Sequence, residues 1–377
     1  MNTPLKQTTT PGRPQPHAGI QALPRYQPGK RELAGGGEPI KLSSNESAFG
    51  ASPAAIAAYQ RAGNELHRYA DSTQAELRRE IAGIYQIDAR RIVCGNGSDE
   101  IIDLLIRAYL GQGDELLLSE NYFVMFEVHG RTQGARIVLA PERDYHMDVD
   151  AVLARVTPAT RMVALASPNN PTGTYLPQSE VQRLHAGLPG NVLLVLDGAY
   201  AEYVTAPDFD PGFTLVNTTE NVVLTRTFSK IYGLAALRIG WVYAPDHVVD
   251  VLERIRSPFN ASGPAQAAAA AAVRDQDFVR KSREHNAAWL ERLGREMTAI
   301  GIAMLPSAAN FYLLRFPGTS GKTAVAAAAW LESRNIIPRL VPGSEKDNVL
   351  RITVGLDGEN LAVMAALTEF MQVKSQK

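Results

Sequence analysis

The chain has 377 residues, 45% of them apolar and 20% charged, and this mixture excludes a wholly disordered polypeptide. Its 38 basic and 39 acidic residues give a net charge of −1, which argues against binding nucleic acid through many phosphate contacts. The single cysteine, Cys94, cannot form an intrachain disulfide, and apolar stretches such as Ala267–Val273 are too short to span a membrane. We therefore expect a soluble, cytoplasmic protein with no nucleic-acid partner and no membrane partner.

Residues 1–40 are expected to form an N-terminal arm. The segment Met1–Pro16 is rich in Thr and Pro and contains no apolar stretch of the kind found in signal peptides. A flexible arm that precedes the first domain is the simplest interpretation of this composition.

From about residue 52 the sequence alternates between helical patterns and short apolar runs, as in a parallel sheet whose strands are joined by helices. Helices are predicted over 73–85 and directly after the glycine-containing turn at 95–99. Runs rich in Val, Leu and Ile predict strands that are covered on both faces. These strands are 91–94, 115–118, 136–139, 162–166, 192–196 and 222–225, with a weaker candidate at 240–243. The pattern predicts a large α/β domain over residues 41–263.

The alternating pattern breaks at Pro258–Pro264, where we place the domain boundary. An alanine-rich helix is predicted over 265–273 and a long charged helix over 277–300. The remaining predicted elements are a strand at 311–316, a helix at 323–334, a strand at 350–354 and a closing helix at 359–373. They indicate a smaller C-terminal α/β domain over residues 264–377.

Three polar loops follow predicted strands of the large domain. The first is Ser167–Gly173, the second begins at Asp197, and the third contains Lys230. Because ligands bind beyond the carboxyl ends of parallel strands, we expect these loops to meet at one site. A fourth segment, Gly95–Asp99, opens a helix, where free N–H groups favour a phosphate.

Each feature alone has a simpler interpretation: the glycine turn as a mere connection, Asp197 as a helix N-cap and Lys230 as a solvated loop residue. Together they supply a lysine for a Schiff base, an aspartate for a pyridinium nitrogen and a phosphate site. These are the groups that pyridoxal 5'-phosphate requires. The combination therefore predicts a site for this cofactor.

Several motifs resemble those of fold-type I pyridoxal-phosphate-dependent aminotransferases. They are Ser167-Pro-Asn-Asn-Pro-Thr-Gly173, Asp197-x-x-Tyr200, Thr227-x-Ser229-Lys230 with Arg238 eight residues later, and Leu350-Arg351-Ile-Thr-Val-Gly355. More narrowly, the sequence resembles histidinol-phosphate aminotransferases from about residue 23 to the C-terminus. The segments that carry this narrower resemblance are Tyr26-Gln-Pro-Gly29, Leu42–Glu46, Arg68-Tyr69 and Gly97-Ser-Asp-Glu-x-Ile-x-x-Leu-Ile-Arg107.

The resemblance implies a role for each matching residue at the cofactor. Lys230 would form the Schiff base and move a proton, and Asp197 would keep the pyridine nitrogen protonated. Tyr200 and Asn170 would bind the phenolic oxygen, and Phe123 would stack on the pyridine ring unless it is only a core residue. The residues expected around the phosphate are Gly97, Ser98, Asp99, Thr227, Ser229 and Arg238.

The resemblance also implies a substrate site and a partner subunit. Arg351, with Arg339, Tyr26 and Asn45, is expected to bind the substrate and its anionic end, which suits the planar donor fork of arginine. Tyr69 is expected to reach the phosphate of the neighbouring subunit's cofactor, so that the active sites are shared within a homodimer.

The sequence departs from the family pattern at three places. Gly198 stands where a glutamate is more common, the stretch Ser119–Tyr122 lacks the usual proline, and residues 340–350 are atypical. Because Asp197 and Tyr200 are kept, we expect the cofactor chemistry to be kept as well. The atypical segment leaves the amino donor open.

The predicted function is transfer of an amino group from histidinol phosphate to 2-oxoglutarate, giving imidazole acetol phosphate and glutamate in histidine biosynthesis. The first alternative is an aromatic amino acid aminotransferase, and the second is a lyase such as threonine-phosphate decarboxylase. A transcription regulator with an aminotransferase-like domain is disfavoured, because the first 40 residues are too short for a DNA-binding region. The seven histidines show no metal-ligand spacing, so no metal is expected.

Overall fold

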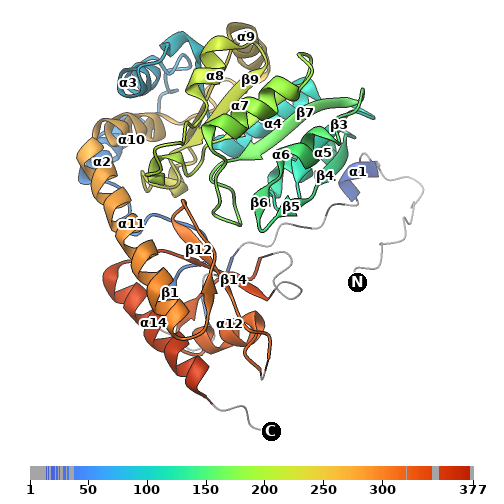
Figure 1. Cartoon of the computed structure of the whole chain (residues 1–377). Coiled ribbons are helices and arrows are strands. Elements are labelled where there is room, and N and C mark those ends of the chain that lie inside the picture. Colours follow the sequence, from blue (N-terminus) through green and yellow to red (C-terminus); the bar gives the residue numbers. More distant parts are fainter. Residues whose placement is uncertain are drawn as a thin grey trace.

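The computed structural model describes residues 38–319, 321–341 and 348–373, together with 14, 16, 18–21, 23, 25, 29, 30, 32 and 33. All but two residues of the predicted arm segment Met1–Pro16 lie outside these ranges. Figure 1 shows an upper body built around a large sheet and a lower body built around a smaller one. The long helix α11 (Gln276–Ala299) runs from the upper body to the lower one.

A seven-stranded sheet in the order β2-β10-β9-β8-β7-β3-β4 forms the centre of the upper body. Only β10 runs antiparallel to its neighbours. The strands are β2 (Ile92–Gly95), β3 (Glu115–Ser119), β4 (Arg136–Ala140), β7 (Thr160–Ala166), β8 (Leu193–Asp197), β9 (Val222–Thr227) and β10 (Gly240–Tyr243). All the strands predicted for the large domain are present, and their ends differ from the predicted ones by at most two residues.

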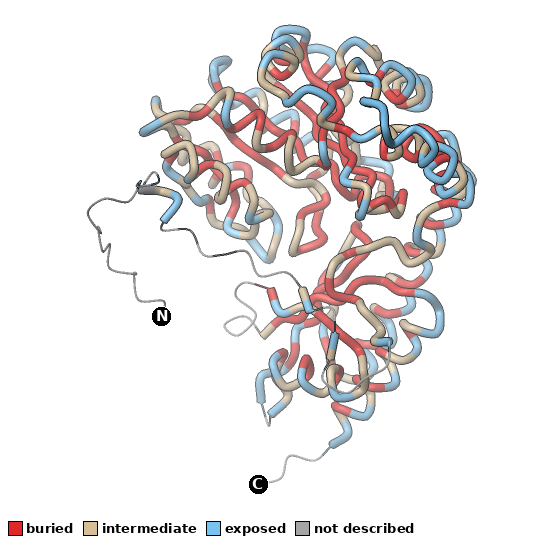
Figure 2. The backbone as a smooth tube through the Cα atoms, turned by 180° about the vertical axis from the view of Figure 1, so that it is seen from behind, coloured by how far each residue is buried: buried red, intermediate tan, exposed pale blue. Residues whose placement is uncertain are grey.

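Neighbouring residues of these strands belong to two different cores, one on each face of the sheet. On β8, Leu194 and Leu196 pack into one core, whereas Leu193 and Val195 pack into the other. Figure 2 shows the resulting buried layer between more exposed helices. Because both faces are covered, the strands do not alternate between apolar and polar residues. This explains their continuous apolar sequences.

Helices cover both faces of this sheet. The helices on one face are α4 (Ser98–Tyr109), α5 (Met125–Thr132) and α9 (Asp246–Ile255). Those that contribute to the other core are α2 (Pro53–Ala62), α3 (Ala75–Tyr85), α6 (Val149–Leu153), α7 (Gln178–Gly187), α8 (Phe213–Thr218) and α10 (Gly263–Arg274). The alanine-rich α10 packs closely against α2 and α3. The helix that follows the predicted boundary at residue 263 thus packs with elements that precede it.

The lower body contains the antiparallel sheet β11-β12-β14, whose core also receives Trp289, Leu293 and Met297 of α11. Its elements are β11 (Ala303–Met304), β12 (Phe311–Arg315), α12 (Ala324–Glu332), β13 (Ile336–Ile337), β14 (Val349–Thr353) and α14 (Asp357–Gln372). Other short elements of the described residues are α1 (Ala18–Gln21), β1 (Ile40–Lys41) and the hairpin of β5 (Glu142–Arg143) and β6 (His146–Met147).

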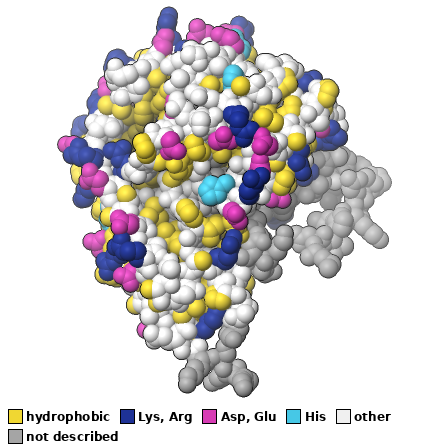
Figure 3. All heavy atoms as spheres, in the orientation of Figure 1, with side chains coloured by type: hydrophobic (Ala, Val, Ile, Leu, Met, Phe, Trp, Pro, Cys, Tyr) yellow, Lys and Arg dark blue, Asp and Glu magenta, His cyan; other side chains and the backbone are white. Residues whose placement is uncertain are grey.

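The beginning of the chain also contacts the lower body. β1 pairs in parallel with β13. The next residue, Leu42, donates its N–H to the Ile337 carbonyl at 3.0 Å and accepts from the Thr353 N–H at 2.9 Å. Acidic and basic side chains are interspersed over the face of the molecule shown in Figure 3, in line with the balanced composition.

Candidate active site

A cavity of about 270 Å³ lies beyond the carboxyl ends of β7, β8 and β9. Its walls come from the loops that follow these strands and from the start of α4. The sequence candidates that line it are Ser98, Asp99, Phe123, Asn170, Asp197, Tyr200, Thr227, Ser229, Lys230 and Arg238. Ala166, Pro168, Ala199 and Ala235 complete the lining. Sequence reasoning did not select these four residues, since small apolar residues carry no chemical signal.

Asp197 is the last residue of β8 and is 5% exposed. Burial raises the pKa of its carboxyl group to about 6, although hydrogen bonds from the Thr225 hydroxyl and the Ala199 N–H act in the opposite direction. The Thr225 Oγ1 lies 3.0 Å from Asp197 Oδ1. Thr225 was expected only as a strand residue, because its contact with Asp197 joins two different strands. A buried carboxyl group of this kind can hold a proton on a neighbouring ring nitrogen.

Lys230 follows β9 and places its amine at the cavity. The flanking Phe228 and Ile231 are fully buried and anchor the backbone on either side. The Nζ atom donates to the Ser44 carbonyl over 3.4 Å and lies 5.5 Å from the centre of the Tyr200 ring. This hydrogen bond is long, so it holds the amine only weakly and lets it turn toward a carbonyl group in the cavity.

The other end of the cavity gathers donors at the start of α4. Gly97 precedes the helix with φ +85°, and a Cβ atom there would lie 2.5 Å from Arg238 Nη2. Glycine therefore allows the guanidinium group to approach the first helical turn. Arg238 Nη1 donates to Ser229 Oγ at 3.4 Å, and Thr227 Oγ1 lies 3.0 Å from the same oxygen. A guanidinium group, hydroxyl groups and a helix N-terminus together favour an anion.

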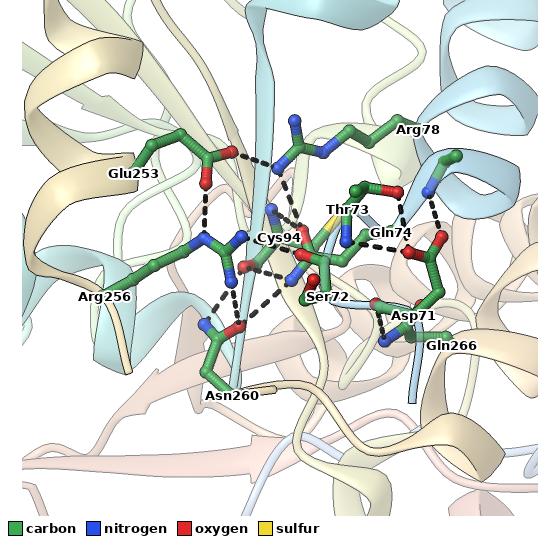
Figure 4. A network of polar contacts seen from close by, with 11 residues as sticks. Asp71, Ser72, Thr73, Gln74, Arg78, Cys94, Glu253, Arg256, Asn260 and Gln266 are labelled. Carbon is green, nitrogen blue, oxygen red and sulfur yellow. Dashed lines mark hydrogen bonds and ion pairs between the residues drawn. The ribbon is translucent and has the colours of Figure 1, made fainter. Parts of the chain in front are cut away.

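A polar network fixes the strand that leads into this glycine turn (Figure 4). β2 is an edge strand, and the Gln74 side chain takes the place of a further strand beside it. Its amide accepts from the Cys94 N–H at 3.0 Å and donates to the Cys94 carbonyl at 3.1 Å. Asn260 Nδ2 donates to the same carbonyl at 3.2 Å and to Glu100 Oε2 at 2.8 Å. The turn before α4 is thereby held from both ends.

Two of the predicted substrate residues contact residues that line the cavity. Asn45 Nδ2 donates to the Tyr200 hydroxyl at 3.0 Å, and Arg351 Nη1 donates to Asn170 Oδ1 at 2.5 Å. Arg339 lies beside Arg351, because their backbones pair through hydrogen bonds of 2.9 and 3.0 Å.

Of the remaining candidates, Tyr69 does not line the cavity. Tyr26 lies outside the described residues, as do residues 342–347 of the atypical segment. Tyr69 is 84% exposed, and its ring stacks on Phe259 with 4.4 Å between the ring centres.

These residues fit pyridoxal 5'-phosphate by the chemistry of the donor set. Arg238, the hydroxyl groups and the α4 N-terminus suit a phosphate, Asp197 suits a protonated ring nitrogen, and Lys230 suits an aldehyde. Within the described ranges, no group of three or more His, Cys, Asp or Glu residues is arranged to hold a metal ion. None of the helices in these ranges has the length and hydropathy of a membrane span.

Residues 37–366 match the sequence pattern of aminotransferase class I and II. The chain belongs to this family. The motifs predict a fold-type I aminotransferase that uses pyridoxal 5'-phosphate. The family, the fold class and the cofactor of this prediction are confirmed.

Relatives of this aminotransferase agree with the assignment. The chain is 50% identical to a histidinol-phosphate aminotransferase of Rhodopseudomonas palustris (strain HaA2) over 360 residues, which cover 95% of this chain and 99% of the relative. The structure of histidinol-phosphate aminotransferase from Sinorhizobium meliloti in complex with pyridoxal-5'-phosphate has a TM-score of 0.82 at 31% identity. That match covers 88% of this chain and 91% of the other. L-threonine-O-3-phosphate decarboxylase from Porphyromonas gingivalis matches at 22% identity with a TM-score of 0.73, covering 89% and 100% of the two chains, and this likeness concerns the fold alone.

Proposed function

We propose that this enzyme transfers the amino group of histidinol phosphate to 2-oxoglutarate, giving imidazole acetol phosphate and glutamate. The observation that carries this proposal is the antiparallel bridge between Arg339 and Arg351. Residues that face each other in such a bridge direct their side chains to the same side of the sheet, with Cα atoms about 5.5 Å apart. Two arginine side chains on the same side of a sheet can bind one anion together, each through its planar donor fork.

A phosphate dianion suits this pair better than a carboxylate does. A carboxylate can be satisfied by one arginine, whereas a phosphate offers three strong acceptor oxygens. Arg351 also contacts Asn170, which lines the cavity, so the anionic end of the donor would lie next to the reacting end. The names of the relatives at about 50% identity support the same donor.

The residues of the chain divide the chemistry among them. When bound, pyridoxal 5'-phosphate supplies an electron sink for the carbanion formed at the donor's Cα atom. Lys230 accepts and returns the proton at that atom, since its amine is at the cavity and only weakly held. Asp197 holds the proton on the ring nitrogen, and Tyr200, positioned by Asn45, binds the phenolic oxygen together with Asn170. Phe123 lies on the cavity wall, where its ring can stack on the pyridine.

We further propose that two copies of the chain form a homodimer through the surface around Tyr69. Exposed large apolar side chains, which mark interaction sites on proteins, occur from α2 to Tyr69 and at Phe259, whose ring stacks on Tyr69. They are Ile56, Tyr59, Leu66, Tyr69 and Phe259. The segment that follows Tyr69 contains Gln74, whose side chain binds Cys94 and so fixes this segment next to the turn that precedes α4. In a symmetric dimer, this arrangement lets each Tyr69 reach the phosphate end of the partner's cavity.

Sedimentation of the purified enzyme tests the dimer, and a fully active monomer would contradict it. Tyr69→Phe removes only the hydroxyl group and should weaken pyridoxal phosphate binding by about tenfold, the value of one hydrogen bond to a charged group. Tyr59→Phe, on the same surface, is the matched control and should bind the cofactor as the wild type does. Equal cofactor affinity in Tyr69→Phe and the wild type would remove the shared-site proposal.

The donor is tested by measuring kcat/KM for histidinol phosphate, phenylalanine and tyrosine with 2-oxoglutarate. Histidinol phosphate should be preferred by about tenfold for each 1.4 kcal/mol of differential transition-state binding. Arg339→Gln should reduce kcat/KM for histidinol phosphate more than for phenylalanine. Arg334→Gln is the control, since Arg334 pairs with Glu369 at the surface of the lower body. If the enzyme turned over phenylalanine as well as histidinol phosphate, an aromatic aminotransferase would be favoured. If it released carbon dioxide without a keto acid, a lyase would be favoured.

A further inference from the structure

His129 of α5 lies between two carboxylates of α4. Its Nε2 atom is 3.2 Å from Asp99 Oδ1, and its Nδ1 atom is 3.3 Å from Asp103 Oδ1. A neutral imidazole has one N–H group, so one ring nitrogen would turn its lone pair toward a carboxylate oxygen. Only the imidazolium form donates to both acids. The two short contacts therefore favour the positively charged form of His129.

The electrostatics of the site agree with this geometry. Burial lowers the pKa of His129, but the hydrogen bonds and charges of Asp103 and Asp99 outweigh it and raise the pKa to about 9. In turn, the hydrogen bond from His129 lowers the pKa of Asp103. His129 is therefore a cation at neutral pH.

Asp99 makes this charge relevant to the cofactor. It is the second residue of α4 and lines the cavity next to Ser98, at the end where Arg238 and the helix N-terminus favour an anion. A carboxylate at this position repels a phosphate. The imidazolium group of His129 cancels that charge and holds the Asp99 side chain on the α5 side.

The other charged groups around His129 have partners of their own. Asp103 also lies 3.6 Å from Arg107 Nη1, so these two charges offset each other. α5 packs against α1, α4 and β4. On α5 itself Glu127 pairs with Arg131, on β4 Arg136 pairs with Glu115, and α1 carries no charged residue. Arg238 and Glu100 also lie near the phosphate end, where Glu100 accepts hydrogen bonds from the Asn96 N–H and from Asn260 Nδ2. Asp99 and His129 form the charge pair of this end that faces α5.

We propose that His129 is a positioning residue of the phosphate site, which neutralises Asp99 so that α4 can accept the cofactor's phosphate. The inference rests on the proposed function only in that the cavity binds pyridoxal 5'-phosphate. It is independent of the amino donor. It assigns a role to a residue outside the cavity that none of the motifs includes.

The test compares pyridoxal 5'-phosphate with pyridoxal, which lacks the phosphate, in binding titrations of the full-length chain. His129→Asn should raise the dissociation constant for pyridoxal 5'-phosphate by about tenfold, as expected for one charge near a phosphate. The constant for pyridoxal should stay within about twofold of the wild type. His247→Asn is the matched control, because His247 also pairs with a carboxylate, Glu220, at 3.3 Å but does not line the cavity.

A second variant separates the charge effect from a packing effect. Asp99→Asn introduced into the His129→Asn chain removes the repelling carboxylate and should restore the binding of pyridoxal 5'-phosphate. Equal loss for both ligands would show that His129 only joins two helices and would overturn the proposal. A double variant as weak as His129→Asn alone would also overturn it. A wild-type chain that binds neither ligand would instead refute the proposed function, whereas a different amino donor would leave this inference intact.

Discussion

The buried carboxyl group of Asp197 should make the cofactor-free enzyme less stable as the pH rises. Its pKa is about 6 in the folded chain, against a model-compound value of 3.8, because burial disfavours the charged form. Between these two values the folded chain binds more protons than the unfolded chain does. The free energy of unfolding therefore falls as the pH rises through this range. A difference of about two pKa units corresponds to roughly 3 kcal/mol above pH 6.

Asp197→Asn removes this penalty without changing the shape of the side chain. Near pH 4 the variant and the wild type should have similar stability, because the wild-type carboxyl group is then protonated in the folded chain. At pH 7 the variant should be more stable by up to about 3 kcal/mol. Urea unfolding of both cofactor-free proteins from pH 4 to pH 7.5 measures this difference directly.

The exposed Asp250 provides a control with the opposite sign. A hydrogen bond from Arg254 lowers the pKa of Asp250, so Asp250→Asn should lose stability relative to the wild type as the pH rises. A stability difference between Asp197→Asn and the wild type that does not change with pH would refute the reasoning. A wild type more stable than Asp197→Asn at pH 7 would refute it as well.

Two further substitutions test other parts of the structure. Glu202→Gln should lower the free energy of unfolding by about 3 kcal/mol or more. The reason is that the buried Arg226 guanidinium loses its charged partner, which lies 2.6 Å away in the wild type. Glu369→Gln breaks the more exposed pair with Arg334 and should lower the free energy of unfolding by less than about 1 kcal/mol in the same urea assay. Lys230→Ala should lose the visible absorption of the covalently bound cofactor, and borohydride reduction of the wild type should label Lys230; a label on another lysine would contradict the assignment of the nucleophile.

The sequence predicts the central sheet well because its strands are covered on both faces. Burial on both sides leaves a local signal, the continuous apolar run, at every strand. The direction of β10 has no such signal, since an antiparallel and a parallel strand of four buried residues look alike. The alanines of α10 likewise predict a closely packed helix without saying which helices it packs against. Its contacts with α2 and α3 depend on residues about 200 positions away.

The site residues divide in the same way. Those with a defined motif, such as Asp197 and Lys230, gather at one cavity. Thr225 and His129 were missed because each acts through a residue about 30 positions away, and no local pattern links the two members of either pair. The departure at Gly198 has a physical reason that only the fold reveals. A Cβ atom there would lie 3.0 Å from Arg226 Cδ, so the stem of this buried arginine occupies the space.

The contacts of Leu42 impose an order on the folding of the chain as it is synthesised. Leu42 emerges from the ribosome early, but its hydrogen-bonding partners are Ile337 and Thr353, close to the carboxyl end. All strands of the large sheet lie before residue 244, so this sheet can assemble while the second half of the chain is still being made. The segment at residues 40–42 has to wait until residues 337 and 353 have been made, and closing so long a loop is slow. The smaller sheet and the segment at residues 40–42 therefore complete folding together, after the large sheet.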